Sequence, residues 1–327
     1  MNIDTSLLLK LCSAFGPSGH ESQISEMIAD ELKDFADEIY NDTLGNLIVH
    51  KKGMGKRVML AAHMDSIGLI VTNIADGFAY CAPIGGVSPS YALSTYVRFE
   101  SGVRGVFMCG TKTKRTDLKV SEMFIDIGAK DNEEAEKLIS VGDVCVMENH
   151  GFVQNGRVFS NCLDNRIGCF VLIEAMKQMK ATDNDVYAVF TVQEELGLRG
   201  ARASSYAIDP DVAVSIDVMT ATDTPDSSGN SLKLGGGAGI KVKDGSIITH
   251  KDIRDSLIDI AKEAGVKYQL EVAASGGTDG GAIHQTRAGV KTGGISVPSR
   301  YTHSSGESID LSDVEAAIVI TAGFASK

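Results

Sequence analysis

The segment RVMLAAHMD, residues 57–65, constrains the fold more than any other part of the chain. It carries apolar residues on both faces until His63 interrupts it. A half-buried strand alternates apolar and polar residues, whereas a strand that is apolar on both faces is typical of the centre of a mostly parallel sheet covered by helices. The sequence therefore predicts an α/β protein with a central strand that ends at His63.

Helix and strand patterns alternate along most of the chain. Apolar residues at helical spacing predict helices over residues 5–15, 21–37, 165–180 and 252–264 and from Asp310 onward. The segments NLIVH, VYAVFTV, VAVSIDV, YQLEVA and VKTGGISV have the composition of strands. This alternation predicts an α/β fold with a mostly parallel mixed sheet flanked by helices.

The stretch of residues 68–157 has a different pattern. Short β-like runs such as YVRFES and VRGVFMC are broken there by Gly, Pro, Ser and Asn. We expect an inserted small β-rich domain that divides a discontinuous α/β domain into residues 1–67 and 158–327. Outside the insertion, TATDTPDSSGNS at 220–231 is polar enough to form a mobile loop.

Composition excludes several classes of partner. The net charge of −12 argues against nucleic acid, because phosphate binding requires a clustered basic surface. No apolar run reaches the roughly eighteen residues of a membrane span, and the N-terminus lacks the pattern of a secretion signal. The six cysteines include no C-x-x-C pair, which fits a reducing compartment. We expect a soluble cytoplasmic protein that binds neither nucleic acid nor membrane.

His63 and Asp65 stand where the predicted central strand ends. Residues two apart on a strand face the same side, so both side chains can lie at the edge where open α/β sheets bind ligands. A histidine that binds a metal through one ring nitrogen usually donates its other N–H to a carboxylate or a carbonyl. Asp65 is the candidate for that supporting role, although H-x-D alone is also typical of a hydrogen-bonded structural pair.

Five further residues with ligand or acid–base side chains lie at predicted strand ends or at a helix start. Asp164, in NCLDNRIG, precedes a predicted helix, where Asp serves either as an N-cap or as a ligand. Glu194 and Glu195 end a buried strand, where an ionised pair is costly unless a cation or a proton compensates it. Asp217 ends VAVSIDV and is followed by Val and Met rather than turn residues. His303 follows a strand, in VPSRYTHSSGE.

These residues predict a centre for two divalent metal ions per chain. The expected ligands are two imidazoles and three carboxylates, namely His63, Asp164, Glu195, Asp217 and His303. Such mixed ligation suits Zn²⁺ or Co²⁺, with Mn²⁺ as a further candidate, rather than Ca²⁺. Three carboxylates and one bridging hydroxide balance the charge of two divalent ions. Glu194 is left over, and we expect it to be the general base that activates the attacking water.

The motifs around these residues are A-H-M-D-x-I-G, L-D-N-R-x-G, F-T-V-Q-E-E-x-G-x-R-G-A, S-I-D-V, G-G-T-D and P-x-R-Y-x-H-S. Together they resemble the tetrahedral aminopeptidase family, which includes glutamyl aminopeptidases and proteins labelled cellulase M, over nearly the whole chain. The resemblance implies a zinc-peptidase-like catalytic domain in which Asp164 bridges both metal ions. It further implies that Glu195 and His303 complete one site. His63 and Asp217 would complete the other.

The same resemblance implies that Glu194 is the catalytic base and that Asp65 supports the first histidine. It also implies that the insertion at 68–157 assembles dimers into a hollow homo-oligomer of twelve subunits. A cellulase activity is not expected, because glycosidases use a pair of metal-free carboxylates. The expected function is the removal of N-terminal residues from peptides with a free N-terminus.

Two other functions remain open. A related co-catalytic metallo-amidase or deacylase would use the same metal pair and would require the N-acylated substrates that an aminopeptidase rejects. A non-enzymatic assembly protein that keeps the fold would bind metal without hydrolysing peptides. The sequence also leaves open the preferred N-terminal residue, and whether GGTDGG from Gly276 caps a helix or contacts the substrate.

Overall fold

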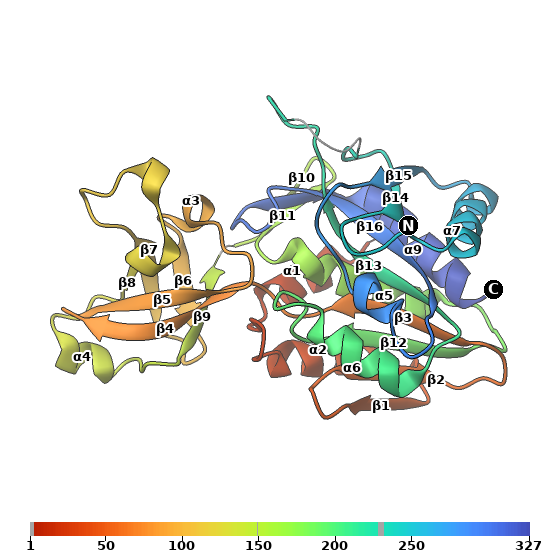
Figure 1. Cartoon of the computed structure of the whole chain (residues 1–327), viewed down its shortest axis with the longest axis horizontal. Helices are drawn as coiled ribbons and strands as arrows, with labels where there is room; N and C mark the ends of the chain where they lie inside the picture. The colour runs from red at the N-terminus through yellow and green to blue at the C-terminus, as the bar shows by residue number, and fades with distance from the viewer. Residues whose placement is uncertain (1–2, 149, 228–231) are drawn as a thin grey trace.

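The computed structural model describes residues 3–148, 150–227 and 232–327, so residues 228–231 of the polar stretch lie outside the described part. The described residues form a large α/β part and a small β barrel that projects from one side of it (Figure 1). None of the helices in these ranges has the length and apolar content that crossing a membrane requires.

The large part is an 11-stranded mixed sheet with helices on both faces. Its strands are β1 (Glu38–Asn41), β2 (Leu47–Lys51), β3 (Arg57–His63), β10 (Phe152–Gln154), β11 (Arg157–Ser160), β12 (Asp185–Thr191), β13 (Val212–Thr220), β14 (Ala238–Lys243), β15 (Tyr268–Val272), β16 (Lys291–Arg300) and β17 (Glu307–Asp310). Its helices are α1 (Thr5–Ser13), α2 (Ser22–Leu32), α5 (Leu163–Gln178), α6 (Arg199–Ile208), α7 (Lys251–Ala264), α8 (Gly280–Ile283) and α9 (Leu311–Ala325).

The sheet runs in the order β1-β2-β12-β3-β13-β16-β17-β11-β10, with β14 beside β16 and β15 beside β14. Strands β12, β3, β13 and β16 are parallel, while β2 and β17 pair antiparallel with the two ends of this group. The expected mixed sheet flanked by helices is therefore confirmed, with its parallel pairing concentrated in the centre.

Strand β3 lies between β12 and β13 and is buried along almost its whole length. Val58, Leu60 and Ala62 pack on the side covered by α1, α2, α5, α7 and α9. Met59 and Ala61 pack on the opposite side, against α6 and α8. Successive side chains of a strand point to opposite faces, so burial on both faces requires the continuous apolar run seen in the sequence.

The register of the central strands brings their carboxyl ends together. Thr191 at the end of β12 lies opposite His63 at the end of β3. Asp217 of β13 lies opposite Ser296 of β16. Side chains that follow these strands consequently meet at one edge of the sheet, where open α/β sheets bind ligands.

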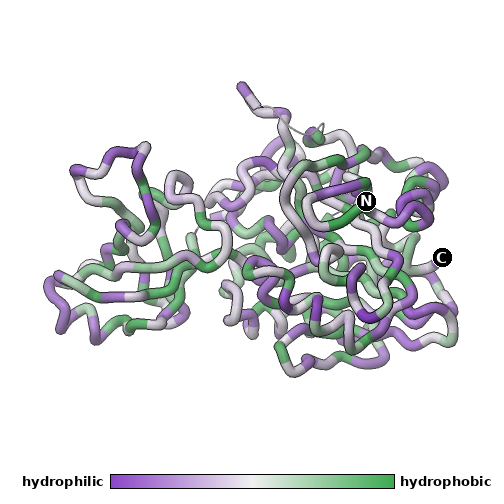
Figure 2. Tube along the Cα trace, in the orientation of Figure 1, coloured by the Kyte–Doolittle hydropathy of each residue, from purple (hydrophilic) through white to green (hydrophobic). Residues whose placement is uncertain are grey.

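The small part is a closed barrel with its own apolar core. It contains β4 (Gly68–Ala75), β5 (Phe78–Ile84), β6 (Tyr96–Phe99), β7 (Arg104–Met108), β8 (Phe124–Asp126) and β9 (Val144–Glu148), with α3 (Pro89–Ala92), α4 (Asn132–Glu136) and the 3-10 turns η1 (Arg115–Asp117) and η2 (Val120–Glu122). Leu69, Val97, Phe99, Phe107 and Ile125 are among its buried residues. Figure 2 shows hydrophobic segments along the strands of both parts and hydrophilic segments at the outer turns.

Several features differ from the sequence-based expectation, and the helix expected over residues 21–37 ends at Leu32. Strand β10 lies within residues 68–157 but pairs with β11 in the large sheet, so the barrel ends at Glu148 rather than at residue 157. Helix α6 and strand β14 are absent from the prediction. The α6 segment RGARASSYAI contains only two large apolar residues, Tyr206 and Ile208, which are too few for a clear helical repeat, and the glycines at 235–237 mask the start of β14.

Candidate active site

All the residues singled out from the sequence lie together at the carboxyl edge of the central strands. They come from the end of β3, the turn after it, the start of α5, the turn between β12 and α6, the last third of β13 and the β16–β17 connection: His63, Asp65, Asp164, Glu194, Glu195, Asp217 and His303. The parallel order of these strands is what converges the side chains.

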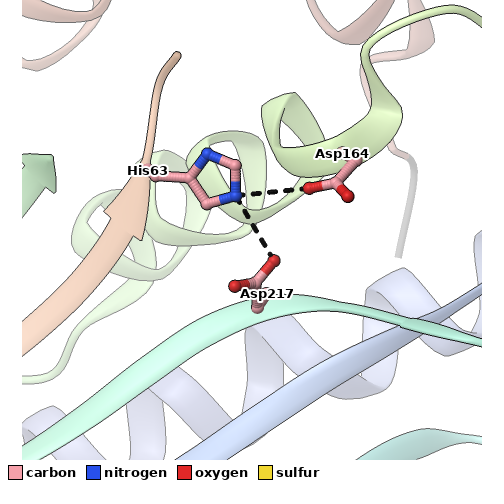
Figure 3. Close-up of side chains that lie close together, drawn as sticks. All are labelled: His63, Asp164 and Asp217. Carbon is pink, nitrogen blue, oxygen red and sulfur yellow. Dashed lines mark ion pairs between the residues drawn. The ribbon is translucent and has the colours of Figure 1, made fainter. Parts of the chain in front are cut away.

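His63 faces two of the carboxylates through one ring nitrogen. Its Nε2 lies 3.2 Å from Oδ1 of Asp164 and 3.6 Å from Oδ1 of Asp217 (Figure 3). Its Nδ1 lies 3.1 Å from the backbone carbonyl oxygen of Asp65. A carbonyl oxygen only accepts, so Nδ1 donates the proton and Nε2 is the nitrogen left to take a second proton or a metal ion.

His303 repeats this arrangement. Its Nε2 lies 3.1 Å from Oε1 of Glu195 and 3.3 Å from Oδ2 of Asp164. Its Nδ1 donates to the carbonyl oxygen of Gly86, at 3.0 Å, in the connection between β5 and α3. A Cβ at position 86 would lie 2.7 Å from this nitrogen, so only glycine lets the backbone approach the ring so closely.

Asp164 is shared by the two histidines, one through each carboxylate oxygen. The alternative role of helix cap is taken by its neighbour, because Oδ1 of Asn165 accepts the backbone N–H of Gly168 at 3.0 Å. The backbone is non-helical at both residues, which separates Asp164 from the regular helix that follows. Its side chain is thereby available to both imidazoles.

Asp65 organises the turn that carries the two glutamates. Its Oδ1 accepts the backbone N–H of Glu194 at 3.0 Å, and its Oδ2 accepts the N–H of Glu195 at 3.2 Å and the hydroxyl of Ser18 at 2.6 Å. Its carboxylate is 3.5 Å from Nδ1 of His63, farther than the carbonyl of the same residue. Asp65 therefore contacts His63 more closely through its backbone than through the side chain singled out from the sequence.

The charges of the site shift its pKa values in opposite directions. Burial raises the pKa of Glu194 well above its ordinary value, and Asp217 and Asp279 raise it further. Hydrogen bonds with Asp164 and then Glu195 raise the pKa of His303 to about 11. Burial alone would raise the pKa of Asp164, but its hydrogen bonds to the two histidines outweigh burial and lower it.

Negative charge exceeds positive charge at this edge. Seven carboxyl groups, each buried or nearly so, surround the two imidazoles: Asp65, Asp164, Glu194, Glu195, Asp217, Asp279 and Glu307. Buried carboxylates require compensation by cations or protons. Two groups of side chains each bring one imidazole and two carboxylates together: His63 with Asp164 and Asp217, and His303 with Asp164 and Glu195. Zn²⁺ and Co²⁺ accept such ligands, so these residues fit divalent ions.

Two residues of the site were missed in the sequence. Glu307 accepts the backbone N–H of His303 at 2.7 Å and that of Asp164 at 2.9 Å, and so joins the segments that carry these two residues. Asp279 of GGTDGG makes no capping bond to α8 and instead hydrogen-bonds Thr191 at 2.5 Å. For Glu307, the sequence signal was its position four residues after His303.

A cavity of about 830 Å³ opens onto the side chains of His63, Asp164, Asp217, Glu195 and His303. Its other walls come from β13, from the segment after β12 and from residues 272–277, which join β15 to α8. The first two glycines of GGTDGG, Gly276 and Gly277, line it, while Asp279 does not. This volume lies within the range of small-molecule sites in proteins.

The fold and site define a class of protein, namely α/β proteins with a histidine–carboxylate centre at the carboxyl ends of parallel strands. Within that class, the model of the M42 glutamyl aminopeptidase family matches residues 45–320. This chain belongs to the M42 family of aminopeptidases.

Two curated proteins with similar sequences agree with this assignment. A putative aminopeptidase from Acetivibrio thermocellus is 46% identical over 314 residues, which is 95% of each chain. The lysyl aminopeptidase of Pyrococcus furiosus is 37% identical over 331 residues, covering 97% of this chain and 95% of its own.

Solved structures share the whole fold. An aminopeptidase from the archaeon Desulfurococcus kamchatkensis superposes with a TM-score of 0.94 at 37% identity, covering 98% of this chain and 94% of its own. The TET1 peptidase of Pyrococcus horikoshii, described as assembling into a tetrahedron or a large octahedral shell, has a TM-score of 0.90 at 34% identity, with 99% of each chain covered.

Proposed function

We propose that this chain is a metal-dependent aminopeptidase with two divalent metal ions per subunit. One ion would be held by His63, Asp164 and Asp217. The other would be held by Asp164, Glu195 and His303. Two observations carry the proposal. Within each group, the possible ligand atoms all lie within 4.8 Å of one another, and both groups contain Asp164.

The residues around the ligands suit amide hydrolysis. When bound, the two ions would supply Lewis acidity, which acidifies an attacking water and polarises the substrate carbonyl. Glu194 belongs to neither ligand group, and its Oε2 lies 3.9 Å from Nε2 of His63. We assign it the role of general base, which takes a proton from the water at a carboxylate oxygen and returns it to the leaving amine nitrogen.

The charge of the cavity favours a free N-terminus. Four of the residues that line it are carboxylates, namely Asp164, Glu194, Glu195 and Asp217. Three of these would be neutralised by the bound ions, which leaves the carboxylate of Glu194 as the negative charge that attracts the protonated amino group of an unblocked peptide. Acetylation removes that positive charge, so this feature supports an aminopeptidase over a deacylase.

The test measures metal content and hydrolysis of leucyl-p-nitroanilide before chelation, after it, and after addition of Zn²⁺, Co²⁺ or Mn²⁺. We expect two ions per chain in the active protein, loss of activity on chelation, and no hydrolysis of the N-acetylated substrate. Full activity without bound metal would reject the metal centre. Exclusive hydrolysis of acetylated substrates would identify a deacylase, and bound metal without turnover of any peptide would identify an assembly protein.

We also propose that the chain forms a homo-oligomer, a dodecamer, through contacts of the β barrel. The support is the similarity to the tetrahedral TET1 peptidase and the apolar side chains that the barrel exposes, among them Tyr91, Tyr96 and Val141. A cytoplasmic location is consistent with six free cysteines, four of them buried.

A further inference from the structure

We propose that this enzyme prefers peptides whose N-terminal residue has an uncharged aliphatic side chain, such as leucine or methionine. The proposal concerns the walls of the cavity above the ligand groups and rests on the aminopeptidase function proposed above. Peptides with an acidic or a basic N-terminal residue would be hydrolysed less efficiently.

The charged side chains of the cavity already have roles in the proposed metal centre or as the general base. Among the described residues that line it, every acid and every histidine belongs to the proposed ligand and base set: His63, Asp164, Glu194, Glu195, Asp217 and His303. Once two divalent ions are bound, the ligand carboxylates are neutralised. Among the described residues, no lysine or arginine lines the cavity, so none of them offers a counter-charge to a substrate carboxylate there.

The remaining walls are apolar or uncharged. Leu198, Val218, Met219 and Val272 contribute aliphatic or thioether surface. Between them lie alanines, glycines and hydroxyl side chains, mainly from the segment 272–277. Val272 is 58% exposed, so an apolar side chain stands uncovered at this wall. An uncharged aliphatic group gains free energy when it is buried against such a surface, because apolar area is removed from water.

Two cations close to the cavity are held by other partners. Arg300 pairs with both carboxylate oxygens of Asp223, at 2.8 and 2.7 Å. Lys243 donates to the carbonyl oxygens of Asp244, at 2.9 Å, and Ala273, at 3.3 Å. Neither side chain is part of the cavity lining. A glutamyl side chain at the wall would therefore lose hydration without gaining a salt bridge.

A lysyl side chain meets the same obstacle with the opposite sign. Val272 and the uncharged residues after it present no carboxylate at the wall. Placing an ammonium group there costs its hydration free energy, which exceeds what weak contacts with hydroxyl groups return. The wall consequently favours uncharged N-terminal side chains because it lacks charge itself, and not because it forms a specific hydrogen bond.

The experiment compares kcat/KM of the metal-loaded enzyme for leucyl-, methionyl-, glutamyl- and lysyl-p-nitroanilide. We expect the leucyl and methionyl substrates to exceed both charged substrates by at least about tenfold. A higher kcat/KM for the glutamyl or the lysyl substrate would overturn the proposed preference and leave the aminopeptidase function intact. No hydrolysis of any of the four would overturn the function and the preference together.

Variants at the wall sharpen this test. Val272→Lys should raise kcat/KM for the glutamyl substrate by about tenfold and lower it for the lysyl substrate, and Val272→Glu should do the reverse. Met54→Lys is the matched control, because Met54 is 99% exposed in the turn before β3, at the opposite end of the sheet from the ligands. An equal change in all substrates in both Val272 variants would show that this wall does not contact the N-terminal side chain, and would overturn the proposal.

Discussion

At the scale of single residues, Glu194 and Glu195 are neighbours in sequence with different surroundings. Oε1 of Glu195 lies 3.1 Å from Nε2 of His303, within one ligand group. Glu194 belongs to neither group and is the more strongly perturbed of the two, because burial and nearby Asp217 raise its pKa. In the turn after β12 the two carboxylates reach different partners, Glu195 toward His303 and Glu194 toward His63, which would allow one to bind metal and the other to exchange protons.

The first prediction separates these two roles. Glu194→Gln should keep two metal ions per chain and lower kcat by about 10² to 10⁴, since Gln has the same shape but cannot accept a proton. Glu195→Gln should also lose metal, because a charged ligand is replaced by a neutral one. Metal stoichiometry and kcat are measured for both variants side by side. Wild-type kcat in Glu194→Gln, or equal loss of metal in both, would contradict the assignment.

At the scale of elements, the site depends on a contact between two connections that are far apart in the chain. The β5–α3 connection carries Gly86, and the β16–β17 connection carries His303. Glu307, at the start of β17, holds the backbone of His303 from the other side. Both the barrel side, through Gly86, and the large sheet, through Glu307, therefore contact His303 and orient it.

The second prediction tests this contact. Gly86→Ala places a Cβ where His303 lies, and should displace the ring and lower activity and metal affinity by about tenfold to a hundredfold. The control is Gly306→Ala in the same connection as His303, where an added Cβ meets nothing within 4 Å. Metal titration and kcat/KM distinguish the variants. Unchanged metal affinity in Gly86→Ala would show that Gly86 does not position His303.

At the scale of the whole molecule, the excess of buried carboxyl groups would couple the proposed metal binding to stability. In the metal-free protein, burial raises the pKa of Asp279 to about 7, and carboxylate partners raise that of His303 to about 11. A group with a higher pKa in the folded than in the unfolded state stabilises the fold at low pH. That contribution is lost as the pH rises through the folded pKa.

The third prediction follows from this sign. The Tm of chelator-treated protein should fall as the pH rises from about 6 to about 9, because folded Asp279 loses its proton near pH 7, and because the unfolded chain loses the His303 proton that the folded state keeps up to about pH 11. Addition of Zn²⁺ at the upper pH should restore Tm, since a ligand of the folded state stabilises it. Calorimetry with and without metal checks both effects. A Tm of the metal-free protein that rises with pH would contradict the charge assignment.

The fourth prediction concerns assembly. Light scattering should find a homo-oligomer of about twelve subunits, and Tyr96→Glu, at an exposed barrel position, should reduce its size by placing a charge in an apolar contact. Met54→Glu, at an exposed site on the large part, serves as the control. A monomer with full activity would reject the oligomer, and a stable active dimer would reject the dodecamer alone.

The sequence by itself determined the α/β architecture and which residues reach the site. An apolar run on both faces, as in β3, can only be buried between two layers of helices, and a polar side chain directly after it must emerge at the edge of the sheet. For the same reason, His63 and Asp217 were found from strand patterns alone. The bridging role of Asp164 came from the family resemblance, because a helix cap has the same local pattern.

Only the tertiary structure decided the contacts that orient these residues. The carbonyl of Gly86 on His303, the two backbone bonds of Glu307 and the pairing of β10 with the large sheet all join segments with no shared local pattern. The uncharged wall at 272–277 likewise depends on which side chains line the cavity. Hydrogen bonds depend on distances of a few tenths of an ångström, and in this chain packing between distant segments sets those distances.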